Sequence, residues 1–440
     1  MTTPVVDEVE VHPSRARVYA EGWQSWSPTT WYRRGDDAHR PAEGWQHVMR
    51  FRPGTELPEE GVQGEGLLVI DPGSGEPARI YGTLDAATAV PSIQASWQGD
   101  RVVVEASAPV ETWTTDAASA STGAGAGSLG SAALEAYGDR FGAASGARVG
   151  TPAPRVWCTW YRYFEEVSAA DVLENLRAIE ERRLPVDVVQ IDDGWSLGTG
   201  EWTAPNPRFG SLPDTVGAIR DSGRRAGIWL APFSVGRRSD LARRQPDWLT
   251  GPAGYNWGDD LVGLDLTHPG VRSHLATVFG GLRDLGVDYL KLDFLYSGAV
   301  PADRHDPDAS PIAAYRSGLE LIREVMGEGA YLLGCGAPIL PSVGLVDAMR
   351  VSPDTFHEGG EDGSQGLRGR MSLEARAWQH ERLWTTDPDC LVARPEFALR
   401  EEWAEVVLAA PGLRGFSDRI TELDPRGMEL VRQLLKEPPA

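Results

Sequence analysis

Residues 287–294 read Val-Asp-Tyr-Leu-Lys-Leu-Asp-Phe, a segment in which apolar and polar side chains alternate. Successive side chains of an extended strand point to opposite faces of the sheet. One face of this strand is therefore apolar and carries Leu290, Leu292 and Phe294. The other face presents Lys291 and Asp293. This pattern is typical of a parallel strand whose apolar face meets helices and whose polar residues end in the mouth of a barrel.

Seven further segments of strand length accompany this one after Pro154, and amphipathic stretches separate them. Alternating strands and helices are typical of parallel βα units. Eight such units in succession predict a closed (β/α)8 TIM barrel. The predicted strands begin at Val156, Val186, Ala226, Val287, Ala330, Ala348, Cys390 and Leu413.

Two of the predicted helices carry clear terminal signals. Ser168 followed by Asp171 forms a capping box, and Ser310 with Pro311 begins another helix that ends at Gly327. These signals place helices between predicted strands, as the barrel requires.

The part of the chain before the barrel has a different texture. Up to about Trp113, short β-favouring segments are separated by turns rich in Pro, Gly and Asp. We therefore predict an α/β protein in which a smaller all-β sandwich domain precedes the barrel. The expected boundaries are residues 1–130 for the sandwich, 131–153 for a linker and helix, and 154–440 for the catalytic barrel.

Composition excludes several classes of partner. The chain has 440 residues, with 42 Lys and Arg against 64 Asp and Glu, so its formal net charge is -22 at pH 7. Such a surface repels nucleic-acid phosphates and anionic lipid, and we expect neither nucleic-acid nor membrane partners. No apolar run approaches the roughly 18 residues of a membrane helix. With no visible secretory signal and only three cysteines, the sequence predicts a cytoplasmic protein.

A second strand end repeats the chemistry of the first. Alternation over Met349–Asp354 sends Arg350 and Asp354 to the inside, so two strands each deliver one base and one acid to the mouth. Glycoside hydrolysis needs two carboxyls, one ionised below the anomeric carbon and one that protonates the leaving oxygen. Cations keep the first ionised, and desolvation raises the pKa of the second. A structural ion pair is the alternative interpretation of either base and acid alone.

The second strand ends in Gln-Ile-Asp-Asp-Gly-Trp, residues 190–195. Asp192 and Asp193 can grip neighbouring sugar hydroxyls, and Trp195 can stack on a pyranose face. The acids are also compatible with a carboxylate Mg²⁺ site or with ordinary helix caps. The eight histidines form no HxH or HExxH pair, so we expect no catalytic zinc.

Taken together, these strand ends resemble glycoside hydrolase clan D, and within it the family 36 α-galactosidases (melibiases) rather than family 27. The resemblance covers roughly residues 154–435. It is strongest at the segments QIDDGW, GIWLAPF, LDLTHPGV, YLKLDF and MRVSPD. Several motifs in the right order on consecutive strands make the resemblance specific.

The resemblance implies catalytic roles for the residues in these motifs. Asp293, in the K-x-D motif, corresponds to the nucleophile, and Asp354, which ends the R-x-S-x-D motif, corresponds to the acid/base. Asp192, Asp193, Lys291 and Arg350 would bind the sugar.

The resemblance also implies a wall around the sugar. It would comprise Trp160 on the first strand, Trp229 on the third and Cys335 on the fifth, where family 36 has a cysteine beside the sugar. By itself Cys335 would be read as a core cysteine.

The chain departs from the family in length. Family 36 enzymes are usually much longer, with a larger amino-terminal β-domain and a carboxy-terminal β-domain that is not apparent here. A loop with Trp23 and Trp26 either reaches the barrel mouth or packs on its own sandwich. The insertion at residues 237–263, with Trp248 and Trp257, is another candidate wall.

From these observations we expect a retaining exo-α-galactosidase that needs no cofactor or metal and acts on a small oligosaccharide or α-galactoside. An α-N-acetylgalactosaminidase, a β-L-arabinopyranosidase and a galactosyl-transferring enzyme remain open on the same barrel. A metal-assisted hydrolase, a non-catalytic carbohydrate-binding protein and a homo-oligomeric assembly also remain open.

Overall fold

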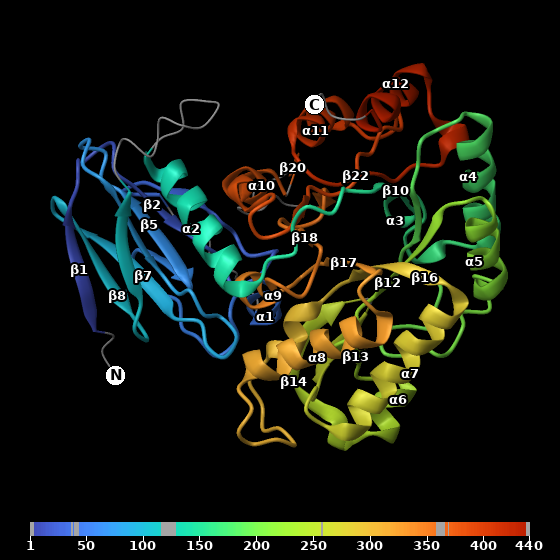
Figure 1. The fold of residues 1–440 in the computed structure, drawn as a ribbon, viewed down its shortest axis with the longest axis horizontal. Helices are drawn as coiled ribbons and strands as arrows, with labels where there is room; N and C mark the ends of the chain where they lie inside the picture. Colours follow the sequence, from blue (N-terminus) through green and yellow to red (C-terminus); the bar gives the residue numbers. More distant parts are fainter. Residues whose placement is uncertain are drawn as a thin grey trace.

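A parallel eight-stranded barrel forms the larger unit of the computed structural model (Figure 1). The structure describes residues 4–36, 38, 44–115, 129–256, 258–357, 366–367 and 369–436. In the described part of the chain, the barrel strands are ordered β21-β18-β17-β16-β12-β11-β10-β22. Their bounds are Arg155–Cys158 (β10), Val188–Ile191 (β11), Arg225–Leu230 (β12), Val287–Leu292 (β16), Tyr331–Gly334 (β17), Ala348–Arg350 (β18), Thr385–Asp387 (β21) and Arg414–Phe416 (β22).

The seventh strand is not the one that the sequence predicts. We expected it to begin at Cys390, whereas β21 spans Thr385–Asp387 and pairs with β18. The short polar segment Thr-Thr-Asp forms the hydrogen bonds to β18. The more apolar segment that begins at Cys390 comes after the turn that follows this strand. Beyond this turn, Leu391 makes a parallel bridge to Phe416, and Leu413 N donates to Thr386 O at 2.9 Å. These contacts join β21 to β22 and close the barrel.

The alternation along β16 is confirmed. Leu290 and Leu292 pack in the main core with the surrounding helices. Tyr289 packs inside the barrel, where its ring stacks on that of Tyr331 at 5.5 Å between centroids. Lys291 and Asp293 lie above this interior cluster, and they continue the inward-facing row to the mouth.

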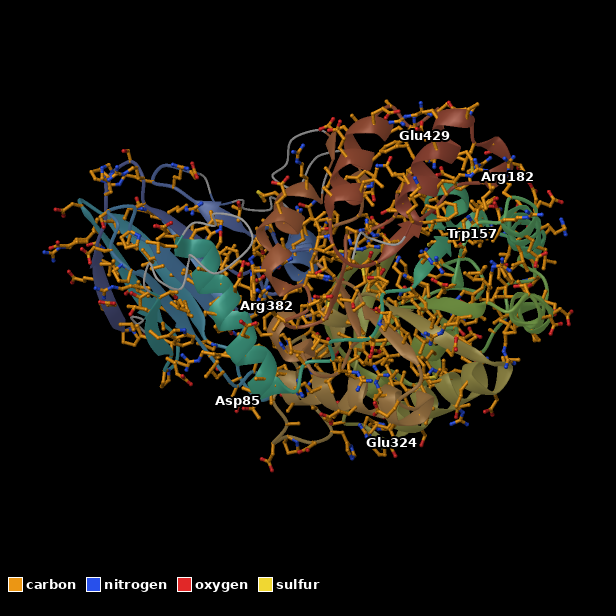
Figure 2. All side chains as sticks on the ribbon, turned by 45° about the horizontal axis from the view of Figure 1, so that its top comes forward. Asp85, Trp157, Arg182, Glu324, Arg382 and Glu429 are labelled. Carbon is orange, nitrogen blue, oxygen red and sulfur yellow. The ribbon has the colours of Figure 1, made fainter. Side chains whose placement is uncertain are left out.

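Helices cover the outside of the barrel, as Figure 1 shows for α4, α5, α7 and α8. The capping box at Ser168 and Asp171 begins α4, and α8 begins after Ser310 and ends at Gly327, as predicted. In Figure 2, Arg182, Glu324 and Glu429 lie on the outer helices, whereas Trp157 is inside. The helix bounds are Ala169–Glu181 (α4), Leu212–Asp221 (α5), Pro269–Leu285 (α7), Pro311–Met326 (α8), Ile339–Ser342 (α9), Arg370–Ala375 (α10), Arg400–Ala409 (α11) and Pro425–Leu434 (α12).

Short elements are inserted in the loops at the carboxyl ends of the strands. The insertion at residues 237–263 contributes to a three-stranded antiparallel sheet of order β13-β15-β14. The half-buried Trp248 packs on His268 and His274, whereas Trp257 lies outside the described residues. The bounds are Trp160–Tyr163 (α3), Ser234–Gly236 (β13), Asp240–Arg244 (α6), Leu249–Asn256 (β14), Asp259–Leu264 (β15), Phe356–His357 (β19) and Gly366–Leu367 (β20).

The amino-terminal part folds as two antiparallel sheets that pack face to face. Their shared core includes Val18, Leu68 and Ile70 from one sheet and Val9, Ile93 and Val104 from the other. The sheets have the orders β1-β8-β7-β4 and β3-β2-β5-β6-β9. The bounds are Val5–Glu10 (β1), Arg17–Ala20 (β2), Thr30–Tyr32 (β3), Val62–Glu65 (β4), Leu67–Asp71 (β5), Ala78–Gly82 (β6), Ser92–Gln98 (β7), Arg101–Ala106 (β8) and Glu111–Thr115 (β9), and a short helix covers Gly44–Arg50 (α1).

The five-stranded sheet is buried on both faces. The side chains of Leu67, Val69 and Ile80 face away from the sandwich core and pack in the cluster that extends into the barrel. Helix α2, Leu129–Ser145, lies across this face with Tyr137 and Phe141. Figure 2 shows Arg382 of the barrel beside α2, where it pairs with Glu135 and Asp139. Double-sided burial explains the continuous apolar run of β5.

A fully buried ion pair crosses the junction between the two units. Arg376 Nε donates to Glu21 Oε1 at 2.7 Å, and both side chains are 0% exposed. The remaining Arg376 nitrogens donate to the backbone oxygens of Gln24, Ser25 and Val351. One guanidinium therefore joins the loop at residues 21–27 to the segment that follows β18.

The same loop reaches the carboxyl end of the barrel. Gln24 bridges to Pro338, and Ser25 N donates to Ala337 O at 3.0 Å. The Trp26 ring packs edge-on against Phe294, the residue after Asp293, at 5.0 Å between centroids. The Trp23 and Trp26 loop therefore packs on the barrel rather than only on its own sandwich.

In the portions of the chain that the structure describes, no helix combines the length and apolar character needed to cross a membrane.

We predict that Glu21→Gln strongly destabilises the protein. It leaves the buried Arg376 charge without its partner, a change that costs about 3–5 kcal/mol. The measurement is the shift in thermal melting temperature. Glu8→Gln is the matched control, because Glu8 pairs with Arg101 on the surface, where both side chains are about half exposed and such pairs contribute about 1 kcal/mol or less. Equal melting temperatures for the two variants would contradict the prediction.

Candidate active site

Lys291 of β16 forms the central ion pair of the barrel mouth. Its Nζ lies 3.0 Å from Asp192 Oδ2, and both residues are buried. Burial alone would lower the pKa of the amine, but the carboxylates of Asp192 and Asp293 raise it well above its usual value. Lys291 is therefore a fixed positive charge paired with Asp192.

Asp192 and Asp193 are positioned by the end of β11. Asp192 Oδ2 accepts a hydrogen bond from Gln190 Nε2 at 2.7 Å, and Asp192 N donates to Thr159 Oγ1 at 2.9 Å. The next turn depends on Gly194, whose φ is 112°. A Cβ at this position would lie 2.6 Å from Glu165 O, so the close approach of the two loops requires glycine.

Among the described residues, Asp193 differs from Asp192 in forming no ion pair with a cation. Burial raises the pKa of Asp193 to about 7, and the nearby carboxylates of Asp192, Glu165 and Asp293 add to the rise. One hydrogen bond from Gly194 N, at 2.7 Å, acts in the opposite direction. This carboxyl therefore changes its charge near neutral pH.

Asp293 is held by two hydrogen bonds. Trp229 Nε1 donates to its Oδ2 at 3.0 Å, and Phe294 N donates to its Oδ1 at 2.8 Å. Phe294 has a left-handed φ of 50°, which turns the chain sharply after the strand. Cys335 lies close by on the segment after β17, where burial and Asp293 raise the pKa of its thiol.

Arg350 of β18 is shared by three carboxylates. Its Nε donates to Asp387 at 3.0 Å, NH2 pairs with Asp389 at 2.7 Å, and NH1 donates to Asp354 at 3.3 Å. Asp387 and Asp389 are buried, but the Asp354 side chain is 39% exposed at the mouth. Burial and the charge of Asp389 raise the pKa of Asp354 above its usual value, although Arg350 and Lys291 oppose the rise. Asp354 is thus the one of these three carboxyls that reaches solvent.

The predicted tryptophans occupy three different environments. Trp160 borders a small cavity together with Lys291 and Arg350. Trp229 is buried and orients Asp293 through its indole N–H. Trp195 is only 3% exposed, packs on Trp202 and donates to Trp229 O at 2.9 Å. Trp160 therefore offers the more open ring, and Trp195 supports the wall from behind.

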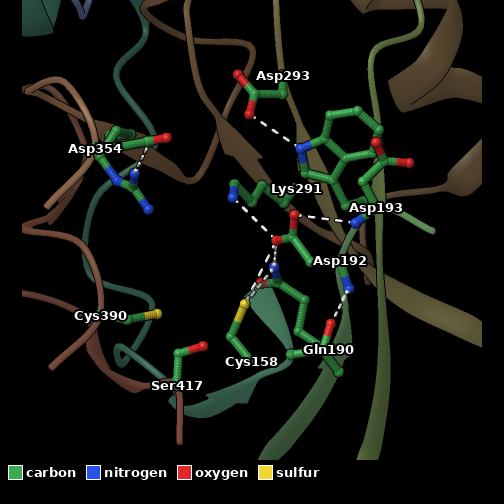
Figure 3. Close-up of polar contacts among 12 residues, drawn as sticks. Cys158, Gln190, Asp192, Asp193, Lys291, Asp293, Asp354, Cys390 and Ser417 are labelled. Atoms are coloured by element: carbon green, nitrogen blue, oxygen red, sulfur yellow. Dashed lines mark hydrogen bonds and ion pairs between the residues drawn. The ribbon is translucent and has the colours of Figure 1, made fainter. Parts of the chain in front are cut away.

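Figure 3 shows how the acidic side chains face one another. Asp192, Asp193 and Asp293 gather around Lys291, and Asp354 lies across from them beside the guanidinium of Arg350. The structure thus brings the predicted polar residues to one mouth, although they lie on three different strand ends.

Sequence reasoning missed the residues that hold Arg350 and Asp192. Asp387 ends β21, the strand that was misplaced, and Asp389 follows it, so their position at the mouth was not recognised. The acid pair in Thr-Thr-Asp-Pro-Asp resembles the acids at other strand ends and was the available signal. Cys158 was also missed, and its Sγ lies 3.4 Å from Asp192 Oδ2.

Among the described residues, no group of three or more His, Cys, Asp and Glu side chains is arranged to hold a metal ion.

We predict that Asp193→Asn stabilises the protein increasingly as pH rises from 5 to 8. The wild-type carboxyl keeps its proton in the folded state up to about pH 7 but loses it near pH 4 when unfolded. The free energy of unfolding of the wild type therefore falls as pH rises between these two values. The amide has no such titration and can still accept from Gly194 N. The measurement is the melting temperature of the variant minus that of the wild type at each pH. A difference that does not change with pH, or one that the exposed control Asp100→Asn reproduces, would contradict it.

Comparison with known proteins supports the assignment of the barrel. A family model described as Melibiase matches residues 154–321. The chain is 30% identical over 144 residues to a bifunctional α-galactosidase/sucrose kinase from Mediterraneibacter gnavus, which is 29% of this chain and 15% of that protein. It is 31% identical over 154 residues to an α-galactosidase from Escherichia coli, which is 32% of this chain and 22% of that protein. The matches thus span less than a quarter of these curated relatives.

A solved structure extends the similarity to nearly the whole chain. An α-galactosidase from Thermus thermophilus, in complex with stachyose, is 29% identical, with a TM-score of 0.79. The alignment covers 97% of this chain and 91% of that one, so a relative of similar length has the same combination of barrel and β-domain. Motifs, family model and fold agree: residues 154–321 match the Melibiase family model, and the chain resembles the family 36 α-galactosidases.

Proposed function

We propose that the protein is a retaining exo-acting α-galactosidase, with Asp293 as the nucleophile and Asp354 as the acid/base. The observation that carries this proposal is the contrast between two carboxyls in one mouth. Asp293 accepts two hydrogen bonds, which hold its carboxyl group in a fixed orientation. Asp354 is accessible to solvent and its pKa is raised, as a proton donor requires.

The mechanism follows from these two roles. A carboxylate oxygen of Asp293 attacks the anomeric carbon while Asp354 protonates the glycosidic oxygen, so the bond to the leaving group breaks and a β-galactosyl enzyme forms. Asp354, now ionised, then removes a proton from water, which attacks the same carbon and releases Asp293. Two inversions retain the α-configuration.

The remaining residues of the mouth fit a neutral sugar. Asp192 and Asp193 offer carboxylate oxygens to adjacent hydroxyls, and Lys291 and Arg350 supply donors. Trp160 offers an aromatic face to the ring. We also place Trp195, Trp229 and Cys335 in the wall around the sugar. Trp195 acts mainly by its hydrogen bond to Trp229 O, and Trp229 by its hydrogen bond to Asp293.

The substrate proposal draws on the structural relative. The Thermus thermophilus α-galactosidase was solved with stachyose and with p-nitrophenyl α-D-galactopyranoside. We infer that this chain also acts on small α-galactosides, both oligosaccharides and aryl glycosides. Because the three cysteines are free and buried, we place the protein in the cytoplasm.

A panel of p-nitrophenyl glycosides tests this function. We expect the highest kcat/KM with α-galactoside, and lower values with the α-N-acetylgalactosaminide and the β-L-arabinopyranoside, which differ from it at C2 and C5. NMR of the first product should show the α-anomer of galactose. A preferred substrate other than α-galactoside, or a β-anomer as first product, would contradict the proposal. Loss of activity with a chelator would favour a metal-assisted hydrolase. A ratio of transfer products to free galactose that rises with acceptor concentration would favour a transferase.

We predict that Asp293→Gly lowers turnover of p-nitrophenyl α-galactoside by about 10⁴-fold or more, as expected for a nucleophile. Sodium azide should restore part of the rate and yield the β-galactosyl azide, because the small anion occupies the vacated space and attacks from the same side. Asp288→Asn is a control on the other end of the same strand and should keep wild-type turnover. Residual activity near the wild-type level in Asp293→Gly would show that another group is the nucleophile.

A further inference from the structure

Asp389 collects more hydrogen-bond donors than its neighbouring carboxylates. Its Oδ1 accepts from Cys390 N at 2.7 Å and pairs with Arg350 NH2 at 2.7 Å. Its Oδ2 accepts from Thr355 N at 2.7 Å, from Thr355 Oγ1 at 2.7 Å and from the Tyr161 hydroxyl. Five donors surround a side chain in a residue that is 1% exposed. Such an arrangement uses the lone pairs of both oxygens and leaves the carboxylate a single orientation.

These donors connect Asp389 to Asp354 along two routes. Thr355 is the next residue after Asp354, so its backbone N–H and hydroxyl tie the adjoining peptide to Asp389. Arg350 forms the second route, because the same guanidinium that pairs with Asp389 donates to Asp354 Oδ1. Asp354 itself has one charged contact at 3.3 Å, and its side chain is 39% exposed. The position of this carboxyl is therefore set by its neighbours rather than by its own contacts.

The backbone around Asp389 is shaped to deliver this carboxylate. Asp389 has a φ of 78°, in the left-handed region that costs free energy for a residue other than glycine. Asp387 Oδ1 accepts a hydrogen bond from Asp389 N at 2.9 Å and stabilises the turn. The turn interrupts the barrel ladder between β21 and Leu391. Strain of this kind persists where surrounding contacts maintain it, and it is frequent at functional sites.

We propose that Asp389 is the positioning residue for the acid/base. It fixes the segment that carries Asp354 through Thr355, and it holds Arg350 at hydrogen-bonding distance. The Asp354 carboxyl then faces the glycosidic oxygen. This inference rests on the proposed function, since it assigns Asp354 the acid role. The role of Asp389 requires no contact with the substrate.

Asp389 also acts on Asp354 through its charge. The charged groups that act on Asp354 are Asp389 and Asp293, whose charges raise its pKa, and Arg350 and Lys291, whose charges lower it. The titratable Tyr161 and Cys335 also face it, and its charge raises the pKa of both. Removing the Asp389 charge lowers the pKa of Asp354, and Arg350 is then free to pair with Asp354 more closely, which acts in the same direction. The acid form would therefore be lost at lower pH.

The test is Asp389→Asn, which keeps the shape of the side chain. We expect the alkaline limb of the kcat/KM profile to move down by about one pH unit. Near the pH optimum, kcat should fall by about 10²-fold for raffinose, whose leaving group needs a proton. The rate with 2,4-dinitrophenyl α-galactoside, whose leaving group does not, should change only a few-fold. Asp354→Asn provides the benchmark for this dependence on the leaving group.

Asp387→Asn is the matched control. Asp387 also pairs with Arg350, at 3.0 Å, but among the described residues Thr355 donates hydrogen bonds to Asp389 and not to Asp387. We expect the alkaline limb of this variant to stay close to its wild-type pH. We expect kcat to fall by the same factor for both substrates. Thr355→Val removes one donor to Asp389 and should reproduce its effect more weakly, which keeps the test decisive where Asp389→Asn does not fold. Circular dichroism and thermal melting identify variants that fold.

Two results would overturn the inference. One is a folded Asp389→Asn enzyme with an unchanged alkaline limb and equal losses on both substrates, which would make the residue purely structural. The other is an equal shift for Asp387→Asn, which would assign the effect to the total charge of the cluster. Failure of the proposed function is distinguishable, because the wild-type enzyme would then lack activity on α-galactosides altogether.

Discussion

The buried cations Lys291 and Arg350 allow so many carboxylates to share one barrel mouth. An isolated charge is costly to bury, whereas a paired and hydrogen-bonded charge is tolerated. Lys291 pairs with Asp192, and Arg350 is divided among Asp354, Asp387 and Asp389. Because two cations cannot serve all these acids equally, some carboxyls are left with weaker compensation.

The uneven distribution of the cations explains why the carboxyl groups at the mouth differ in their pKa values. In the part of the chain that the structure describes, Asp193 has no cation in contact and Asp354 has one at 3.3 Å. The pKa of each carboxyl is raised. Asp192, by contrast, accepts hydrogen bonds from Lys291 Nζ and Gln190 Nε2. The two cation types also suit their places. The compact ammonium of Lys291 fits against a single carboxylate, and the guanidinium of Arg350 can direct three donors to three acids at once.

The amino-terminal sandwich takes part in building the mouth. Its loop at residues 21–27 places Trp26 against Phe294 and, through Arg376, contacts Val351 O. Val351 lies between Arg350 and Asp354, so the β-domain supports the strand end that carries the proposed acid from one side. Asp389 holds the same segment from the other side at Thr355. The sandwich is therefore bound to the candidate site by hydrogen bonds and ring contacts, in addition to its covalent link.

The order of most barrel strands, the inward placement of Lys291, Asp293 and Arg350, and several helix ends followed from the sequence alone, because strand alternation and caps are local properties of a few neighbouring residues. The seventh strand did not, since Thr385–Asp387 is short and polar and becomes a strand only by pairing with β18. The sequence also left open where Trp23 and Trp26 pack. Tertiary structure decided that Asp387, Asp389 and Thr355 surround Arg350 and Asp354, because hydrogen bonds between residues more than thirty positions apart depend on how the closed barrel brings strand ends together.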